Sequence, residues 1–266
     1  MLDRYNRKIN YLRISVTDRC NLRCRYCMPE EGVEFIPHTE ILRFEEIREV
    51  VEVAAGMGVD KVRLTGGEPL VRKGIVDLVE MIASIPGIKD LSMTTNGILL
   101  DAFATPLAKA GLIRVNISLD TMEPERYGWI TRGGDIRKVF AGIEAAKKAG
   151  LDPIKVNCVI KDDRNEPDAV AVRDYCIENG LQVRFIKEMD LHEGTFGVVD
   201  GGSGGDCRNC NRLRLTSNGM IKPCLFSDME FNVRTLGIQQ AIEMALSKKP
   251  EKGTVNLQNC FNNIGG

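Results

Sequence analysis

Residues 18–30 read DRCNLRCRYCMPE, and the cysteines within them, Cys20, Cys24 and Cys27, have the spacing C-x3-C-x2-C. The stretch directly follows residues 11–16, an apolar-rich segment that we expect to form a β-strand. Three thiolates can bind three irons of a [4Fe–4S] cluster and leave the fourth iron open to another ligand. A zinc knuckle is the alternative, but structural zinc usually takes four ligands and no fourth is nearby. The triad therefore predicts an iron–sulfur site after the first strand.

Outward from this triad, strand-like and helix-like segments alternate as far as residue 188. Some of the expected helices are followed by Gly, as a left-handed helix end prefers. Six strands joined by helices pair in parallel through right-handed crossovers, and six units are too few to close an eight-stranded barrel. We therefore predict an α/β fold, an open partial (β/α)6 TIM-type barrel with its ligands at the C-terminal ends of the strands. The strands are expected at residues 11–16, 61–65, 91–95, 114–119, 154–160 and 182–187, and the helices at 44–57, 71–85, 102–110, 136–149 and 166–179.

Beyond residue 188 this alternation stops, and a glycine-rich stretch separates it from a second group of cysteines. We expect three regions: the barrel over 1–192, a flexible connector over 193–206, and a small C-terminal cysteine-rich, cluster-binding extension over 207–266. The extension is expected to contain one helix, over residues 235–247.

The second cysteine triad reads C-x2-C-x13-C and consists of Cys207, Cys210 and Cys224. A second [4Fe–4S] cluster is one interpretation, and zinc is the other, since Cys260 could supply a fourth thiolate. Arg212 and Arg214 follow at alternate positions, so on a strand both guanidinium groups would point to one face. Two guanidinium groups aimed at one place suit an anionic ligand.

Composition places the chain among ordinary globular proteins and sets limits on its partners. The 266 residues are 43% hydrophobic and 27% charged, and the net charge of −1 indicates no broad basic surface for nucleic acid. No run approaches about 18 apolar residues, and the N-terminus is polar, so we expect neither a membrane span nor a signal peptide. We expect a cytoplasmic protein, whose clustered cysteines bind metal rather than pair as disulfides.

These motifs together resemble the radical S-adenosylmethionine superfamily and, within it, the GTP 3′,8-cyclase family of molybdenum cofactor (molybdopterin) biosynthesis. The second strand ends in Gly66-Gly67-Glu68-Pro69, which is similar to the GGEP motif of the superfamily. Further resemblance lies in YLRISVTDRCNLRCRYCMP, VRLTGGEPLVR, TTNG, VNISLD, VRFIKEMD, CNRLRL with PCLF, and the terminal Gly-Gly. The family usually has a longer segment where this chain has residues 193–206.

The resemblance implies a lyase that contains two [4Fe–4S] clusters and uses S-adenosylmethionine. In that family the N-terminal cluster cleaves S-adenosylmethionine to a 5′-deoxyadenosyl radical, which removes a hydrogen from the 3′ carbon of GTP. The ribose radical then attacks C8 of guanine, while the C-terminal cluster holds the base. The implied product is (8S)-3′,8-cyclo-7,8-dihydroguanosine 5′-triphosphate.

The resemblance also implies roles for individual residues. Alternate strand residues can point into the barrel, and buried cations are costly without partners, so the basic strand residues suggest a polyanion. Gly265 and Gly266 resemble a tail that enters the active site. The residues implied for S-adenosylmethionine are Tyr26, Gly67, Glu68, Thr94, Ser118 and Met189. Those implied for GTP are Arg13, Lys61, Arg63, Lys155, Arg184, Arg212 and Arg214, of which the last two are also catalytic.

Two other interpretations stay open at this stage. The short connector is compatible with a radical S-adenosylmethionine paralogue that acts on another nucleotide or on a peptide. A metal-binding interaction module without enzymatic activity is the third. For the cyclase we expect GTP and a low-potential electron donor of the flavodoxin or ferredoxin type as partners, no nucleic acid or membrane, and a possible homodimer.

Overall fold

The computed structural model describes residues 1–258 and 261–264, and in these residues one sheet has the strand order β6-β5-β4-β3-β2-β1-β7-β8-β9. Neighbours from β6 to β7 are parallel, and β8 and β9 continue the sheet antiparallel. The strands are β1 Tyr11–Ser15, β2 Lys61–Thr65, β3 Asp90–Thr95, β4 Arg114–Ser118, β5 Lys155–Ile160, β6 Gln182–Lys187, β7 Arg212–Leu215, β8 Met220–Lys222 and β9 Phe231–Asn232. The first six lie within a residue of their predicted bounds, and the prediction of an open α/β barrel is confirmed.

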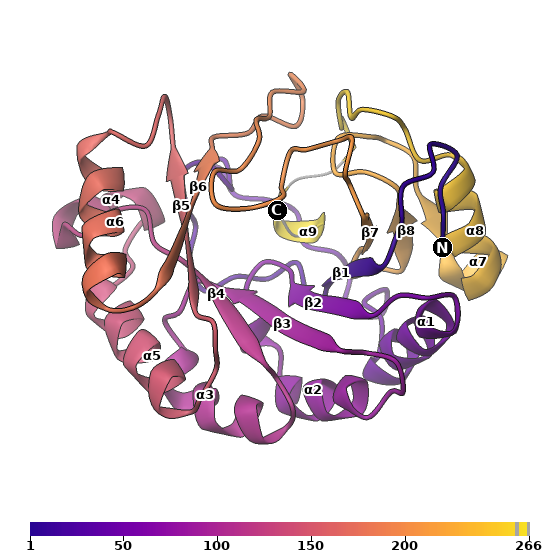
Figure 1. Ribbon diagram of the computed structural model, residues 1–266, viewed down its shortest axis with the longest axis horizontal. Coiled ribbons are helices and arrows are strands. Elements are labelled where there is room, and N and C mark those ends of the chain that lie inside the picture. Colours follow the sequence, from indigo (N-terminus) through magenta and orange to yellow (C-terminus); the bar gives the residue numbers. More distant parts are fainter. Residues whose placement is uncertain (259–260, 265–266) are drawn as a thin grey trace.

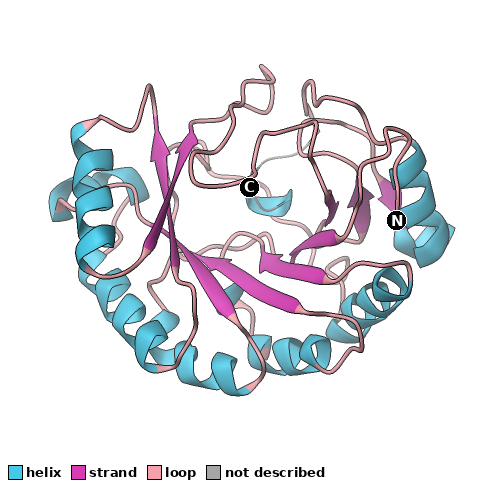
Figure 2. Ribbon diagram, viewed as in Figure 1, coloured by secondary structure: helices cyan, strands magenta, loops and turns pink. Residues whose placement is uncertain are grey.

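Helices cover the convex outer side of this curved sheet, and the arc stays open between β6 and β9 (Figures 1 and 2). The helices are α1 Phe44–Gly56, α2 Ile75–Ala83, α3 Leu100–Lys109, α4 Pro124–Thr131, α5 Ile136–Lys148, α6 Pro167–Glu178, α7 Val233–Leu236, α8 Ile238–Ser247 and α9 Phe261–Ile264, of which α9 lies inside the arc. The helix expected from residue 71 begins at Ile75 instead, because Gly74 at its N-cap has φ +80°. Helix α4 was not predicted. The single C-terminal helix expected is divided by Gly237 into α7 and α8.

Alternate side chains of β1 point to opposite faces of the sheet, one apolar and one charged. Leu12 and Ile14 are completely buried and belong to the main hydrophobic core, whereas Tyr11 and Arg13 line a cavity on the concave side. A parallel sheet covered on both faces is normally apolar on both. The charged concave face therefore indicates a ligand site inside the barrel.

The C-terminal extension completes the sheet instead of lying beside it. Strand β7 pairs with β1 in parallel, in a register that sets Arg214 opposite Arg13. Leu213 and Leu215 of β7 and Ile242 of α8 belong to the same hydrophobic core as the barrel. The second cysteine triad is thus carried next to the first strand.

Residues 193–206 run close against β6 and the segment that follows α8. An isolated bridge joins Phe185 to Asp200, and a Cβ at Gly194, where φ is +72°, would lie 2.1 Å from the Thr254 carbonyl oxygen. Glycine permits this approach because it has no Cβ. The flexibility of the connector, and the division at residues 192 and 206, stay predictions. In the described part of the chain, no helix has the length and apolar character needed to cross a membrane.

Candidate functional site

Two cavities lie on the concave side of the sheet and share the lining residues Asn157, Ile186 and Met189. The larger, of about 280 Å³, is bordered by the second cysteine triad. The smaller, of about 190 Å³, is bordered by the first. Because the two cavities adjoin, a species generated beside one triad can reach a molecule held beside the other.

The loop after β2 fixes the position of the first triad. The backbone N–H groups of Gly67 and Glu68 donate hydrogen bonds of 2.8 Å to the carbonyls of Thr17 and Arg19. A Cβ at Gly67 would lie only 2.3 Å from the Arg19 carbonyl oxygen, so the two loops can approach this closely only with glycine there. The GGEP loop thereby holds the segment that leads into Cys20.

Glu68 is buried in this loop and does not line either cavity. Its carboxylate accepts hydrogen bonds from the Leu70 N–H (3.0 Å), the Thr95 hydroxyl (2.8 Å) and the Asn96 N–H (2.7 Å). Burial raises the pKa of Glu68 to about 7 although these hydrogen bonds lower it. In this structure Glu68 organises the loop, and its contact with S-adenosylmethionine stays a prediction.

The other residues expected around S-adenosylmethionine come together in the smaller cavity. The Tyr26 hydroxyl donates a hydrogen bond of 2.9 Å to Asp120, whose pKa burial raises to about 6. Within residues 1–258 and 261–264, the buried Thr94 hydroxyl has no hydrogen-bond partner, as expected of a group that contacts a ligand. The cavity is lined by Tyr26, Gly67, Thr94, Ser118 and Met189, together with the three cysteines.

The first triad fits an iron–sulfur cluster by its donors and surroundings. Cys20, Cys24 and Cys27 are half-buried and line the same cavity. Burial raises the pKa of Cys20 to about 11 and raises that of Cys24 further, so the thiolates require a nearby cation such as iron. Among residues 1–258 and 261–264, no three Cys, His, Asp or Glu side chains are gathered as a site for a single metal ion.

Three arginines form a row across three adjacent strands of the larger cavity. Strand register sets Arg13 opposite Arg63 on one side and opposite Arg214 on the other, and all three line the cavity. Burial lowers the pKa of each, and neighbouring guanidinium groups lower it further, to about 10 for Arg214. Cations crowded in this way favour a bound polyanion, which would offset both burial and mutual repulsion.

The remaining expected cations lie around this row. Lys61, Arg184 and Arg212 line the larger cavity, and Arg212 shares the inward face of β7 with Arg214 as the alternation predicted. Lys155 is not among the lining residues, but burial, followed by repulsion from Arg184, lowers its pKa to about 8. All of these cations therefore belong to one electrostatic cluster.

The sequence analysis missed two cations of the larger cavity. Arg114, at the start of β4, lines it and forms an ion pair of 2.6 Å with Asp90. The alternation of Arg114, Asn116 and Ser118 could have identified it by the argument used for β1 and β2. Lys249 also lines the cavity, and no motif in the sequence indicated it.

Cys207, Cys210 and Cys224 of the second triad are half-buried at the wall of the larger cavity. Burial acts to raise the pKa of Cys210, but Lys249 and Arg212 outweigh it, so this pKa lies below its usual value. Three soft thiolates, one of them already stabilised by cations, fit a cluster. Cys260, considered as a fourth ligand, lies outside the described residues.

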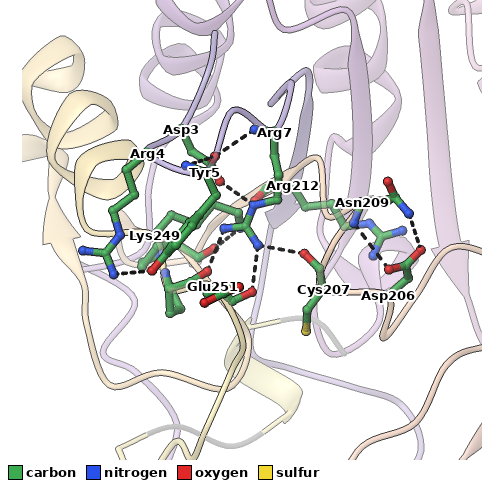
Figure 3. Close-up of polar contacts among 12 residues, drawn as sticks. Asp3, Arg4, Tyr5, Arg7, Asp206, Cys207, Asn209, Arg212, Lys249 and Glu251 are labelled. Carbon is green, nitrogen blue, oxygen red and sulfur yellow. Dashed lines mark hydrogen bonds and ion pairs between the residues drawn. The ribbon is translucent and has the colours of Figure 1, made fainter.

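The N-terminal segment holds the Cys207 loop through Arg7 (Figure 3). The buried Arg7 guanidinium pairs with Asp3 at 2.6 Å and donates hydrogen bonds to the Cys207 carbonyl (2.7 Å) and the Glu251 carbonyl (2.9 Å). It also donates a hydrogen bond of 2.7 Å to the Pro250 carbonyl. Segments about 200 residues apart are thus joined behind the second triad.

Helix α9 lies inside the open arc of the barrel (Figure 1). Phe261 lines the smaller cavity, and the Ile264 carbonyl accepts a hydrogen bond of 3.4 Å from Arg214. The C-terminal segment therefore reaches both cavities. Gly265 and Gly266, expected to enter the site, lie outside the described residues.

Comparison with known families agrees with this geometry. Residues 14–176 match the family model "Radical SAM superfamily", and residues 145–255 match "Molybdenum Cofactor Synthesis C". A protein of Petrotoga mobilis named GTP 3′,8-cyclase is 40% identical over 302 aligned positions, which cover 94% of each chain. The chain belongs to the GTP 3′,8-cyclase family of the radical SAM superfamily. The family resemblance seen in the sequence is thereby confirmed.

A second GTP 3′,8-cyclase, from Pelotomaculum thermopropionicum, is 43% identical over 307 positions, which cover 95% of this chain and 94% of the relative. Both alignments are longer than the 266 residues of this chain, so the relatives carry residues that are opposite gaps here. The place of this shortening, expected at residues 193–206, stays a prediction.

Solved radical SAM structures share the fold. Native anSMEcpe with bound AdoMet superposes with a TM-score of 0.67 at 18% identity, covering 91% of this chain and 81% of that one. Streptococcus suis SuiB bound to S-adenosylmethionine has a TM-score of 0.66 at 16% identity, and the match covers 92% of this chain but 65% of SuiB. These likenesses support the barrel architecture.

Proposed function

We propose that this chain converts GTP to (8S)-3′,8-cyclo-7,8-dihydroguanosine 5′-triphosphate in molybdenum cofactor biosynthesis, as a radical SAM lyase. The observation that carries the proposal is the row Arg214–Arg13–Arg63 in a cavity that adjoins the first cysteine triad. A polyanion bound by this row would lie next to the place where S-adenosylmethionine is cleaved. A nucleoside triphosphate has the charge and the reactive ribose that this arrangement requires.

Two [4Fe–4S] clusters would be held by the described cysteines, one by Cys20, Cys24 and Cys27 and the other by Cys207, Cys210 and Cys224. When bound, the first would supply the electron for reductive cleavage of S-adenosylmethionine, and the second would bind the guanine base. The electron donor is a low-potential protein of the flavodoxin or ferredoxin type. We place the enzyme in the cytoplasm, with residues 193–206 connecting the barrel to the cluster-binding extension, and a homodimer as its possible assembly.

The chain's own residues orient the reactants. Arg13, Arg63 and Arg214 bind the triphosphate, with Lys61, Lys155 and Arg184 as further cations. Tyr26, Thr94, Ser118 and Met189 bind S-adenosylmethionine in the smaller cavity, and Met189 lies at the junction of the two. Arg212 and Arg214 act near the reacting nucleotide, and α9 with Phe261 limits access of water to the radical.

The decisive experiment is a turnover assay with GTP under anaerobic conditions. Protein reconstituted with iron and sulfide is supplied with S-adenosylmethionine, a reductant and GTP. The expected products are 5′-deoxyadenosine, methionine and the cyclised nucleotide, identified by mass spectrometry. Cleavage of S-adenosylmethionine with GTP left unchanged would mean that the substrate assignment is wrong. Zinc in place of iron would reject the radical mechanism itself.

A further inference from the structure

Lys249 is a buried cation at the second cysteine triad. Its side chain is 2% exposed, and its ammonium group donates hydrogen bonds to the Arg212 carbonyl (2.8 Å) and the Pro223 carbonyl (2.5 Å). Lys249 lines the same cavity as Cys210 and Cys224, and its charge acts electrostatically on both thiols. The ammonium group thus joins the two backbone segments that carry these cysteines.

The partners of Lys249 differ from those of the other buried cations in this part of the fold. Arg7 is neutralised by Asp3 at 2.6 Å, and the completely buried Lys222 is paired with Glu230 at 3.3 Å. Within residues 1–258 and 261–264, no carboxylate forms an ion pair with Lys249, and the acceptors of its ammonium group are two backbone carbonyls. Burying an ammonium group is costly unless an anion offsets its charge, and carbonyls offset it only in part. The groups beside Lys249 that can become anionic are the thiols of the second triad, which line the same cavity.

The charges agree with this assignment. Three thiolates around a [4Fe–4S]²⁺ core have a net charge of −1, and one-electron reduction makes it −2. A buried ammonium beside one ligand sulfur would therefore stabilise both states and favour the reduced one, because interactions between charges are strong where water is excluded. Hydrogen bonds and charges near the sulfurs are among the main determinants of cluster potential.

We propose that Lys249 is the counter-cation and positioning residue of the second cluster. It neutralises the cluster through Cys210 and fixes the distance between the segments that carry Cys210 and Cys224. The proposal rests on the second cluster of the proposed function. Lys249 is not a ligand of the cluster, but it would influence the redox potential and the spectrum of that cluster.

The test uses the full chain with Cys20, Cys24 and Cys27 replaced by Ala, so that only the second site can hold iron. In this parent we compare Lys249→Met, which removes charge and donors at similar length, with Lys248→Met. Lys248 is the adjacent, exposed lysine, so the control changes the same net charge at nearly the same place. Iron and sulfide are counted, the reduced cluster is recorded by electron paramagnetic resonance, and its midpoint potential is obtained by dithionite titration.

The expected result is a midpoint potential that shifts to lower values in Lys249→Met, together with a changed resonance spectrum, whereas Lys248→Met matches the parent. An unchanged potential and spectrum in Lys249→Met would overturn the proposal. If that variant assembles no cluster, Lys249→Arg decides, since it keeps the charge. Recovery of the cluster supports the proposal, and continued loss in the Arg variant rejects the charge role.

The same experiment distinguishes an error in the proposed function from an error in the role of Lys249. A parent that holds no four-iron cluster would refute the second cluster itself, and the role of Lys249 would fall with it. A parent with a normal cluster and an unaffected Lys249→Met variant refutes only the role of Lys249.

Discussion

Arg63 lies at the centre of the charged face of the barrel, between Arg13 of β1 and the cations of β4 to β6. Its side chain is 8% exposed, and its guanidinium lies 5.5 Å from the centre of the Tyr11 ring. Its hydrogen bond to the Ser92 hydroxyl supplies no negative charge. A bound anion would offset the free-energy cost of burying this charge.

Replacing Arg63 with Met should weaken GTP binding at least about tenfold, which corresponds to about 1.4 kcal/mol. The reason is the loss of charge-assisted hydrogen bonds to phosphate in a cavity that excludes water. Equilibrium binding of GTP by titration calorimetry under argon measures the effect. Arg137→Met is the control, because Arg137 is exposed, pairs with Asp135 and lies outside the cavity lining. Equal affinities in the two variants would contradict the assignment of Arg63.

The two cysteine triads should separate the two halves of the reaction. Cys24→Ala should abolish cleavage of S-adenosylmethionine, because the first cluster then lacks a ligand. Cys210→Ala should retain uncoupled formation of 5′-deoxyadenosine but yield no cyclised nucleotide, because the substrate base has lost its iron. Chromatographic measurement of both products after anaerobic reconstitution distinguishes these outcomes. Cleavage retained by Cys24→Ala would show that the first triad is not the catalytic site.

Glu68 gives a pH dependence to stability whose sign follows from its burial. Its pKa is raised to about 7 in the folded state, against an ordinary value of 4.5, so the folded state holds the proton more tightly. Below pH 4.5, Glu68 makes its full stabilising contribution to the free energy of unfolding. This contribution is lost as the pH rises through about 7. Glu68→Gln has no such titration. The free energy of unfolding of the natural chain should therefore fall relative to the Gln variant between pH 4.5 and 8.

Urea denaturation of the metal-free protein at several pH values in this range measures that difference. A difference between the two chains that stays constant with pH would show that Glu68 ionises normally in the fold.

At the scale of elements, a clasp between α1 and α7 joins the C-terminal extension to the barrel. Arg234 donates hydrogen bonds to both carboxylate oxygens of Glu46, at 2.8 Å and 3.0 Å, and another of 2.9 Å to the Glu40 carbonyl. Glu46 also accepts a hydrogen bond from the Arg43 N–H at the start of α1. The hydrogen bond with Arg234 lowers the pKa of Glu46 to about 2. One carboxylate therefore begins a helix and fixes the extension.

Arg234→Met should lower the free energy of unfolding by about 1 kcal/mol, because a two-point ion pair is lost at a partly exposed position. Urea denaturation at pH 7 measures the loss. Arg48→Met is the control. Arg48 lies on α1, as Glu46 does, and forms a solvent-exposed pair with Glu52. The loss should shrink as the pH falls from 4.5 towards 2, where Glu46 becomes protonated. Equal stability of the two variants would mean that the clasp contributes nothing specific.

At the scale of the whole molecule, one sheet and one main hydrophobic core join the barrel to the extension. Strand β7 covers the edge of β1 that would otherwise be open, and Leu213, Leu215 and Ile221 extend the core. The same pairing brings the second cysteine triad to the cavity. Stability and the arrangement of the active site thus depend on the same contact between elements distant in sequence.

A chain that ends at residue 206 should aggregate or remain partly folded, because β1 becomes an exposed edge and the core loses the apolar side chains of β7, β8 and α8. Size-exclusion chromatography and thermal unfolding, with the full chain in parallel, provide the measurement. A monomeric fragment that melts at the same temperature as the full chain would show that the barrel folds independently of the extension.

The sequence alone determined the local and chemical features. The strand and helix pattern predicted the open barrel, since period-2 and period-3.6 patterns of apolar residues are local properties. The cysteine spacings and the GGEP motif indicated the family, which the comparisons confirm, and they predict two groups of cluster ligands. The inward direction of Arg212 and Arg214 followed from alternation along a strand.

Only the tertiary structure decided which of these features meet. The parallel pairing of β7 with β1 sets Arg214 beside Arg13, and no local pattern predicts a partner about 200 residues away. The Glu68 carboxylate accepts hydrogen bonds from Thr95 and Asn96 at the end of β3. These contacts depend on the position of β3, which the sequence around Glu68 does not determine. No motif in the sequence indicates Lys249, because the sequence does not distinguish a buried lysine from an exposed one. Its burial against Cys210 depends on packing across the whole fold.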